Sequence, residues 1–169
     1  MNRNQIKQGG GAVQSRLPKS KKEEQEFSVA KDIVICPDCN AVYYHKSWHH
    51  ALEGYDQLSE DKDLQFSVCP ACQMIKEKKY EGQVIIKNVS EKEKKELLNL
   101  IKNTAERALK RDVLDRIIKI KEGSEIEILT TENQLAVGLG KQIKRAFKAK
   151  IDVKWSKGES VARVIADLK

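Results

Sequence analysis

Four cysteines form the clearest chemical pattern in this chain, and they occur as two pairs with the same internal spacing. Cys36 and Cys39 enclose a proline and an aspartate, and Cys69 and Cys72 enclose a proline and an alanine. Two C-x2-C turns can bring four thiolates around one tetrahedral ion, as in zinc ribbons. The pattern therefore predicts a zinc (Zn2+) site whose ligands are Cys36, Cys39, Cys69 and Cys72.

Two other chemistries use the same residues. Iron in a rubredoxin-like site has the same ligand spacing, although such sites usually carry glycine after each pair, where this chain has Asn40 and Gln73. Redox-active cysteines need only one such motif, and intracellular thiols are kept reduced, so zinc is favoured over both. With four thiolates present, His45, His49 and His50 are expected to stay outside the ligand set. A site closed by four protein ligands leaves no position for a substrate, so we expect a structural metal and no enzyme.

The charge of the chain is concentrated rather than spread. The 169 residues carry a net charge of +7, and the first 22 contain basic residues but no acid. We expect residues 1–30 to be a disordered tail and linker, because they hold too little apolar surface to fold. Its candidate RNA contacts are Arg16, Lys19, Lys21 and Lys22, and the alternative is a leader that only aids solubility.

A second basic segment spans residues 141–157, in which Asp152 is the sole acid. On a helical wheel its first basic side chains oppose an apolar face, and the rest continue onto the following strand. These candidate RNA contacts are Lys141, Lys144, Arg145, Lys148, Lys150 and Lys154. The alternative to RNA contact is an ordinary solvated helix face. A nucleotide site just before this segment is not expected, because Gly138-Leu139-Gly140-Lys141 lacks the spacing of a phosphate-binding loop.

The elements that must position these groups follow from hydrophobic periodicity. Strands are expected at 83–89, 113–121, 126–128 and 151–155, and helices at 90–110 and 132–148. Residues 161–168 suit either a further strand or a short terminal helix. The fold class is α+β, with a four-cysteine zinc ribbon at 31–80 followed by a ferredoxin-like β-α-β-β-α-β sandwich at 81–169. Two helices would then cover one face of an antiparallel sheet.

Aromatic and basic side chains in the ribbon are further candidates. Tyr43, Tyr44 and Trp48 follow the first cysteine pair, where they are expected to pack over the metal site, with base stacking as the alternative. The loop between the cysteine pairs is acidic and unlike a phosphate-binding surface. If the ribbon contacts RNA, the basic residues beyond the second pair are expected to do so, namely Lys76, Lys78 and Lys79.

Several of these segments resemble one protein family. Val68-Cys-Pro-Ala-Cys72 followed by residues 80–89 is similar to a segment of the large-subunit ribosomal export adaptor family, originally named for nonsense-mediated mRNA decay. Further similar segments bring the resemblance to roughly residues 33–155; they are 116–123, 125–131, 134–147 and 151–155. The resemblance implies binding to the large ribosomal subunit and metal ligation by the four cysteines. Family members continue into further domains, so we expect a short prokaryotic relative acting in ribosome metabolism and not in nuclear export.

These observations give one leading function and two rivals. The leading prediction is a non-enzymatic factor that binds the large ribosomal subunit or its rRNA, and so affects ribosome metabolism, stability or mRNA decay. Its partners would be rRNA and possibly a ribosomal protein, with no membrane and no small-molecule substrate. The rivals are a zinc-ribbon adaptor that binds a protein and a rubredoxin-like electron carrier. No apolar run is long enough to cross a membrane and no apolar leader begins the chain, so a cytoplasmic location is expected.

Overall fold

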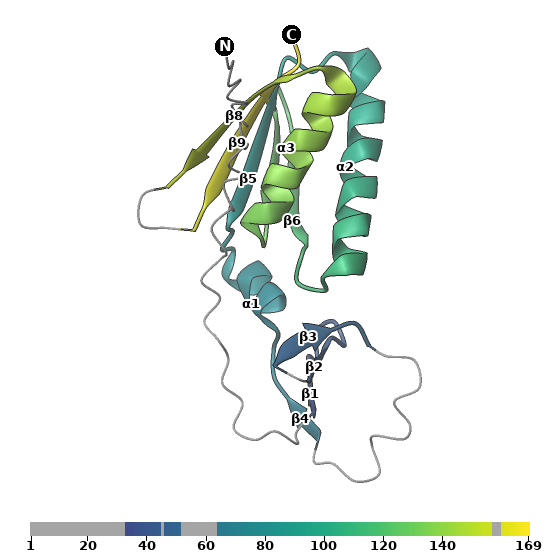
Figure 1. Cartoon of the computed structure of the whole chain (residues 1–169), viewed down its shortest axis with the longest axis vertical. Helices are drawn as coiled ribbons and strands as arrows, with labels where there is room; N and C mark the ends of the chain where they lie inside the picture. Colours follow the sequence, from purple (N-terminus) through teal and green to yellow (C-terminus); the bar gives the residue numbers. More distant parts are fainter. Residues whose placement is uncertain (1–32, 45, 52–63, 157–159) are drawn as a thin grey trace, which may run out of the picture.

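A computed structural model describes residues 33–44, 46–51, 64–156 and 160–169. The tail at 1–30, with Arg16, Lys19, Lys21 and Lys22, lies outside the described residues, as does most of the acidic loop between the cysteine pairs. Within the described part, the chain forms two β-sheets and three helices (Figure 1). We call residues 33–51 and 64–79 the ribbon region and residues 80–169 the α/β region, in each case for the described residues.

The ribbon region is built from very short strands. These are β1 (Ile33–Ile35), β2 (Val42–Tyr44), β3 (Ser47–His49) and β4 (Leu64–Phe66), in the sheet order β3-β2-β1-β4. Strand β1 is antiparallel to β2 and parallel to β4. The helix α1 (Pro70–Glu77) follows, and it begins inside the second cysteine pair. Strands of three residues bury little apolar surface, so this region needs another source of stability.

The α/β region is larger and has a continuous apolar core. Its strands are β5 (Gly82–Lys87), β6 (Ile117–Glu122), β7 (Ile126–Thr130), β8 (Lys150–Trp155) and β9 (Ala162–Asp167). The helices α2 (Glu91–Arg111) and α3 (Asn133–Phe147) lie on the same side of this five-stranded sheet (Figure 1). Burial alternates along β5, β7 and β9, as expected when one face of a sheet meets a core and the other meets water.

Residues 161–168, for which a strand or a helix was expected, form the strand β9, and its position changes the sheet. The sheet order is β6-β7-β5-β9-β8, with β9 parallel to β5 and antiparallel to β8. In a ferredoxin-like sandwich, the strand after the second helix would pair with the first strand. Here β9 takes that place and moves β8 to the edge. The predicted β-α-β-β-α-β order is therefore present with one added strand, but the predicted sheet arrangement is not.

Side-chain chemistry explains why β9 is central and β8 is at the edge. Ala162, Val164 and Ala166 of β9 are fully buried and small, so they fit between the sheet and α3. Strand β8 carries Lys150 and Lys154 at exposed positions, and charged residues on an edge strand discourage pairing with other chains. The arrangement therefore places each strand in the environment that its residues favour.

The strand predicted over 113–121 is partly wrong, because β6 begins only at Ile117. Val113 and Leu114 lie in the loop between α2 and β6, and both are buried against the ribbon region rather than paired in the sheet. The register of β6 against β7 also shifts between Ile117 and Lys119, so Ile118 sits at a bulge. Apolar residues that suggested a longer strand are apolar because they form an interface.

Local capping fixes the start of α2 as the sequence predicts. The Ser90 hydroxyl accepts a hydrogen bond from the Glu93 N–H and donates to the Glu93 carboxylate. The helix then buries Leu97 and Ile101 in the core, whereas Leu109 at its far end is exposed. None of the helices in the described ranges combines the length and apolar character that a membrane span requires.

Candidate metal centre

The two cysteine pairs meet at the junction between the ribbon region and the α/β region. The four Sγ atoms of Cys36, Cys39, Cys69 and Cys72 all lie within 4.8 Å of one another. The Cys39 and Cys69 sulfurs are 3.7 Å apart. A zinc ion at about 2.3 Å from four tetrahedral sulfurs requires sulfurs about 3.8 Å apart, and all four cysteines are free thiols. The cluster is therefore positioned to bind a metal ion, consistent with zinc.

The first cysteine pair is held by a tight turn after β1. Cys36 donates its N–H to the Ala41 carbonyl at 2.8 Å, and Asn40 donates its N–H to the Cys36 carbonyl at 2.9 Å. Asn40 adopts a left-handed backbone with φ of 60°. Asparagine tolerates that conformation better than most residues other than glycine. Asn40 thus provides the same backbone conformation that glycine usually supplies after such a pair.

The second cysteine pair starts a helix, an element that the sequence analysis missed. Cys69 is the N-cap of α1, Pro70 occupies the first turn, and Cys72 donates its N–H to the Cys69 sulfur at 3.5 Å. Cys69 in turn donates its own N–H to the Cys36 sulfur at 3.3 Å. Proline just after a capping residue is a signal for a helix start, and the positive end of a helix favours nearby thiolates. Because Gln73 lies inside α1, no glycine is needed there.

Burial and hydrogen bonding set the protonation of these thiols in opposite directions. Burial raises the pKa of Cys69 far above its ordinary value, and burial also raises the pKa of Cys72, to about 11. Burial acts in the same direction on Cys39, but hydrogen bonds from the Arg116 guanidinium and the Ala41 backbone outweigh it and lower the pKa of Cys39 to about 7. A bound divalent ion would favour the thiolate forms of Cys69 and Cys72, and it would crosslink the two turns and stabilise the fold.

Histidines stay outside the ligand cluster in the described part of the chain, where the only such cluster is that of the four cysteines. His49 bonds to the Ser47 hydroxyl at 2.8 Å, and its ring lies against Tyr44. His50 reaches the other region, with its Nε2 atom 2.6 Å from the Leu109 carbonyl oxygen of α2. His45 lies outside the described residues. Trp48 packs against the cysteine cluster, as predicted, and the ring of Tyr43 lies beside the ring of Trp48.

Searches with family models, curated protein sequences and solved structures found no match to this chain. The site is therefore interpreted from its own geometry. The resemblance to the ribosomal adaptor family stays a prediction.

The basic residues of the segment 141–157 that were predicted to contact RNA lie at the end of α3 and on β8. Lys141, Lys144 and Arg145 are exposed on the C-terminal half of α3, and Lys148 is exposed at its C-cap. Lys150 and Lys154 are exposed on β8, and Lys154 pairs with Asp152 at 3.4 Å. We call this set of six residues the basic end of the α/β region. Among the described residues, none of its members except Lys154 forms an ion pair.

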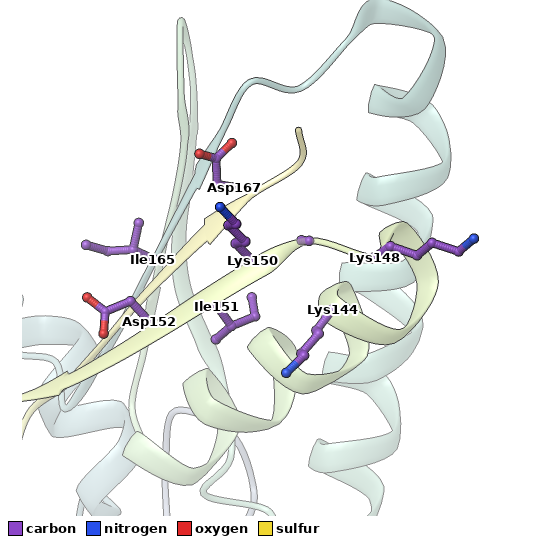
Figure 2. A pocket seen from close by; sticks show the side chains of 8 residues that line it. Lys144, Lys148, Lys150, Ile151, Asp152, Ile165 and Asp167 are labelled. Atoms are coloured by element: carbon purple, nitrogen blue, oxygen red, sulfur yellow. The ribbon is translucent and has the colours of Figure 1, made fainter.

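An open hollow of about 580 Å³ lies at the basic end, between the last turn of α3 and the strands β8 and β9. Its lining includes Lys144, Lys148 and Lys150 but also Asp152 and Asp167 (Figure 2). In Figure 2 the Lys148 side chain points away from the strands, whereas Lys150 lies beside Asp167. The two aspartates in the lining disfavour capture of a small anion in this hollow.

The lysines after the second cysteine pair and the glycines before Lys141 were also candidates in the sequence, and both groups have structural roles. Lys76 pairs with Asp38 at 2.7 Å and so links α1 to the first cysteine turn, while Lys79 pairs with Glu77 at 2.7 Å and Lys78 caps α1. The glycines before Lys141 lie inside α3, and a Cβ on Gly140 would come within 2.6 Å of Val164. Gly140 therefore permits close packing of α3 on β9 and belongs to no phosphate loop.

Proposed function

We propose that this protein is a non-enzymatic, zinc-stabilised factor that binds RNA of the large ribosomal subunit in the cytoplasm. The zinc ion would fold the ribbon region, and the basic end of the α/β region would contact RNA phosphates. The resemblance of residues 33–155 to the ribosomal adaptor family supports the choice of partner. The surface chemistry supports the mode of contact.

The observation that carries this proposal is the exposure of basic side chains that have no acidic partner among the described residues. Lys141, Lys144 and Arg145 are exposed on the last two turns of α3, and Lys148 is exposed at the C-cap that follows. A surface helix that only needs solubility usually mixes both signs of charge, because i,i+4 ion pairs stabilise it. Unpaired cations on a rigid element can instead displace counterions from a phosphate backbone, which gives affinity that falls steeply with salt.

The metal centre supports a binding role over a catalytic one. Cys36 and Cys69 are fully buried and Cys72 nearly so, and a tetrahedral ion with four thiolates has no open coordination position. Such an ion would neither activate a water molecule nor bind a substrate carbonyl. Its contribution would be to the folding of the region that carries it.

Sucrose-gradient sedimentation with purified large ribosomal subunits tests the proposal. The wild-type chain should travel with the subunits at low salt. The variant Lys141→Glu, Lys144→Glu, Arg145→Glu, Lys148→Glu should stay in the top fractions. If about six phosphates are contacted, raising the salt from about 50 to about 200 mM should weaken binding by about a thousandfold.

A matched control variant distinguishes the effect of the site from the effect of a changed net charge. Lys92, Lys95, Lys102 and Lys110 lie on α2, so reversing these four to glutamate gives the same change in charge on the neighbouring helix. This control variant should still sediment with the subunits. Wild-type protein that never leaves the top fractions would refute ribosome binding. Equal loss in both variants would show that the basic end is not the contact surface.

One observation favours an adaptor that binds protein as the second candidate. Phe66 is 69% exposed and Leu64 is 45% exposed on β4, which lies at the edge of the ribbon sheet. An exposed apolar edge strand can accept a strand from another chain. The variant Leu64→Ser, Phe66→Ser should then lose a protein partner while keeping RNA binding, whereas the α3 variant should do the reverse.

The electron-carrier alternative is tested by metal content and absorption. A zinc protein is colourless, and metal analysis should return one zinc per chain. A red protein that contains iron and bleaches on reduction would favour the carrier.

A further inference from the structure

The metal centre is completed by residues from the α/β region. Val113 and Leu114, in the loop after α2, are buried in one apolar cluster with Cys36, Cys69 and Cys72. Arg116 of the same loop directs its Nη1 atom to the Cys72 sulfur at 3.4 Å. The two regions are thus in contact at the cysteines themselves.

The loop is also fixed on its other side, to the α/β sheet. Arg116 donates its N–H to the Thr131 hydroxyl at 2.9 Å, and its carbonyl accepts the Thr131 N–H at 2.9 Å. The Thr131 hydroxyl donates to the Leu114 carbonyl at 2.6 Å. The guanidinium is held in turn by a hydrogen bond from Nε to the Val113 carbonyl at 2.9 Å. A rigid loop therefore presents one cation and two apolar side chains to the cluster.

A second contact between the ribbon region and the α/β region lies at the end of α2. The His50 Nε2 atom is 2.6 Å from the carbonyl oxygen of Leu109, in the last turn of α2. Carbonyls in the last turn of a helix have no partner within the helix, so a donor from the ribbon region satisfies one of them. Both contacts join the ribbon region to the same end of the α/β region.

We propose that the metal site is shared by the two regions, with Arg116 as its outer charge partner, so that metal binding fixes the ribbon region against the α/β region. A divalent ion with four thiolates carries a net charge of −2, and this charge is partly buried. The guanidinium beside Cys39 and Cys72 offsets part of that charge, and it does so from a loop anchored to Thr131. The ion is consequently bound more tightly when the two regions are docked, and by reciprocity the docking is tighter when the ion is bound.

The first test measures the affinity of the full chain for Zn2+ by competition with a chromophoric chelator at fixed pH. Arg116→Gln removes the charge but keeps a hydrogen-bonding side chain, and we expect about tenfold to hundredfold weaker zinc binding. Arg116→Lys should recover part of the lost zinc affinity, because lysine restores the positive charge but not the planar set of N–H donors of the guanidinium. Arg111→Gln is the control, since Arg111 pairs with Asp115 in the adjacent turn rather than with a cysteine.

The second test measures docking by amide hydrogen exchange with and without Zn2+. Zinc removal should speed exchange at the amide of Leu114, which is buried against the cysteine cluster although Leu114 is not a ligand. The amide of Ile128, in the centre of the sheet, should be unchanged.

Two results would overturn the proposal. One is a zinc affinity for Arg116→Gln equal to that of Arg111→Gln. The other is zinc removal that speeds exchange in the ribbon region alone. Neither measurement uses RNA, so its failure is distinct from failure of the proposed ribosomal function.

Discussion

The ribbon region and the α/β region are folded by different forces. The ribbon sheet has four strands of three residues, and its buried cluster consists mainly of the cysteines with Ala41 and Ala71. The α/β sheet has strands of five or six residues, and its core includes fully buried Ile86, Ile128 and Leu139. Coordination can replace apolar burial where a segment is too small to form a core. The comparison predicts that each region responds to its own kind of damage.

The largest expected effect is that of removing the metal ion or one of its ligands. Cys69→Ser, or chelation of the wild type, should unfold the ribbon region, because structural zinc supplies about 10 kcal/mol of apparent binding free energy in small zinc domains. The α/β region should stay folded. Amide NMR spectra would show loss of dispersion in the ribbon region and not in the α/β region. Added zinc should restore the chelated wild type but not the variant, and full unfolding of both regions would contradict the comparison.

The corresponding test for the α/β region is a substitution that leaves a cavity in its apolar core. Leu139 of α3 is fully buried, so Leu139→Ala should destabilise the α/β region by about 2 to 5 kcal/mol. Denaturant unfolding followed by circular dichroism would measure this change, because α2 and α3 supply most of the helix. Ile75→Ala on α1 is a control, since Ile75 is exposed and its loss should cost little. A large fall in stability on Ile75→Ala would show that the ribbon region depends on apolar contacts as well.

The junction between the regions should respond to pH. Burial raises the pKa of Asp115 to about 6, reinforced by the charges of Asp112 and Glu132. A raised carboxyl pKa means that this stability contribution is complete below about pH 4 and is lost as pH rises through about 6. Asp115→Asn should therefore stabilise the chain by roughly 2 kcal/mol at pH 7.5 and by roughly half of that at pH 5.

Denaturant midpoints of zinc-loaded protein at the two pH values measure this difference. The exposed Asp152 provides the control, because Asp152→Asn should have the same small effect at both. A benefit of Asp115→Asn that does not change with pH would contradict the assignment of the penalty to a buried charge.

The smallest effects come from two glycines in one helix that have opposite surroundings. A Cβ at Gly138 meets nothing within 4 Å, so Gly138→Ala should stabilise α3 by up to about 1 kcal/mol through helix propensity. A Cβ at Gly140 would lie 2.6 Å from Val164 Cγ1, so Gly140→Ala should be net destabilising by about 1 kcal/mol. Thermal unfolding of both variants gives the comparison, and the same sign for both would show that packing of α3 on β9 is looser than the structure indicates.

Local signals predicted the elements well where a pattern is complete within a few residues. Apolar periodicity placed both α2 and α3 to within one residue at either end, and at the start of α2 the structure shows a capping box of Ser90 and Glu93. The pattern failed at 113–121, because Val113 and Leu114 are apolar for contact with another region and not for the sheet. Sequence periodicity shows that a residue is buried but not which surface buries it.

The sequence by itself predicted which residues gather at the candidate metal centre, because two C-x2-C turns can bring four thiolates together. It also predicted the order of strands and helices in the α/β region up to β8, which depends on local periodicity, but it left residues 161–168 open between a strand and a helix. Only the tertiary structure decided that β9 separates β5 from β8, that Arg116 and His50 connect the two regions, and that the basic residues of α3 and β8 gather at one end. These features depend on contacts between residues far apart in the chain, for which no local pattern carries information.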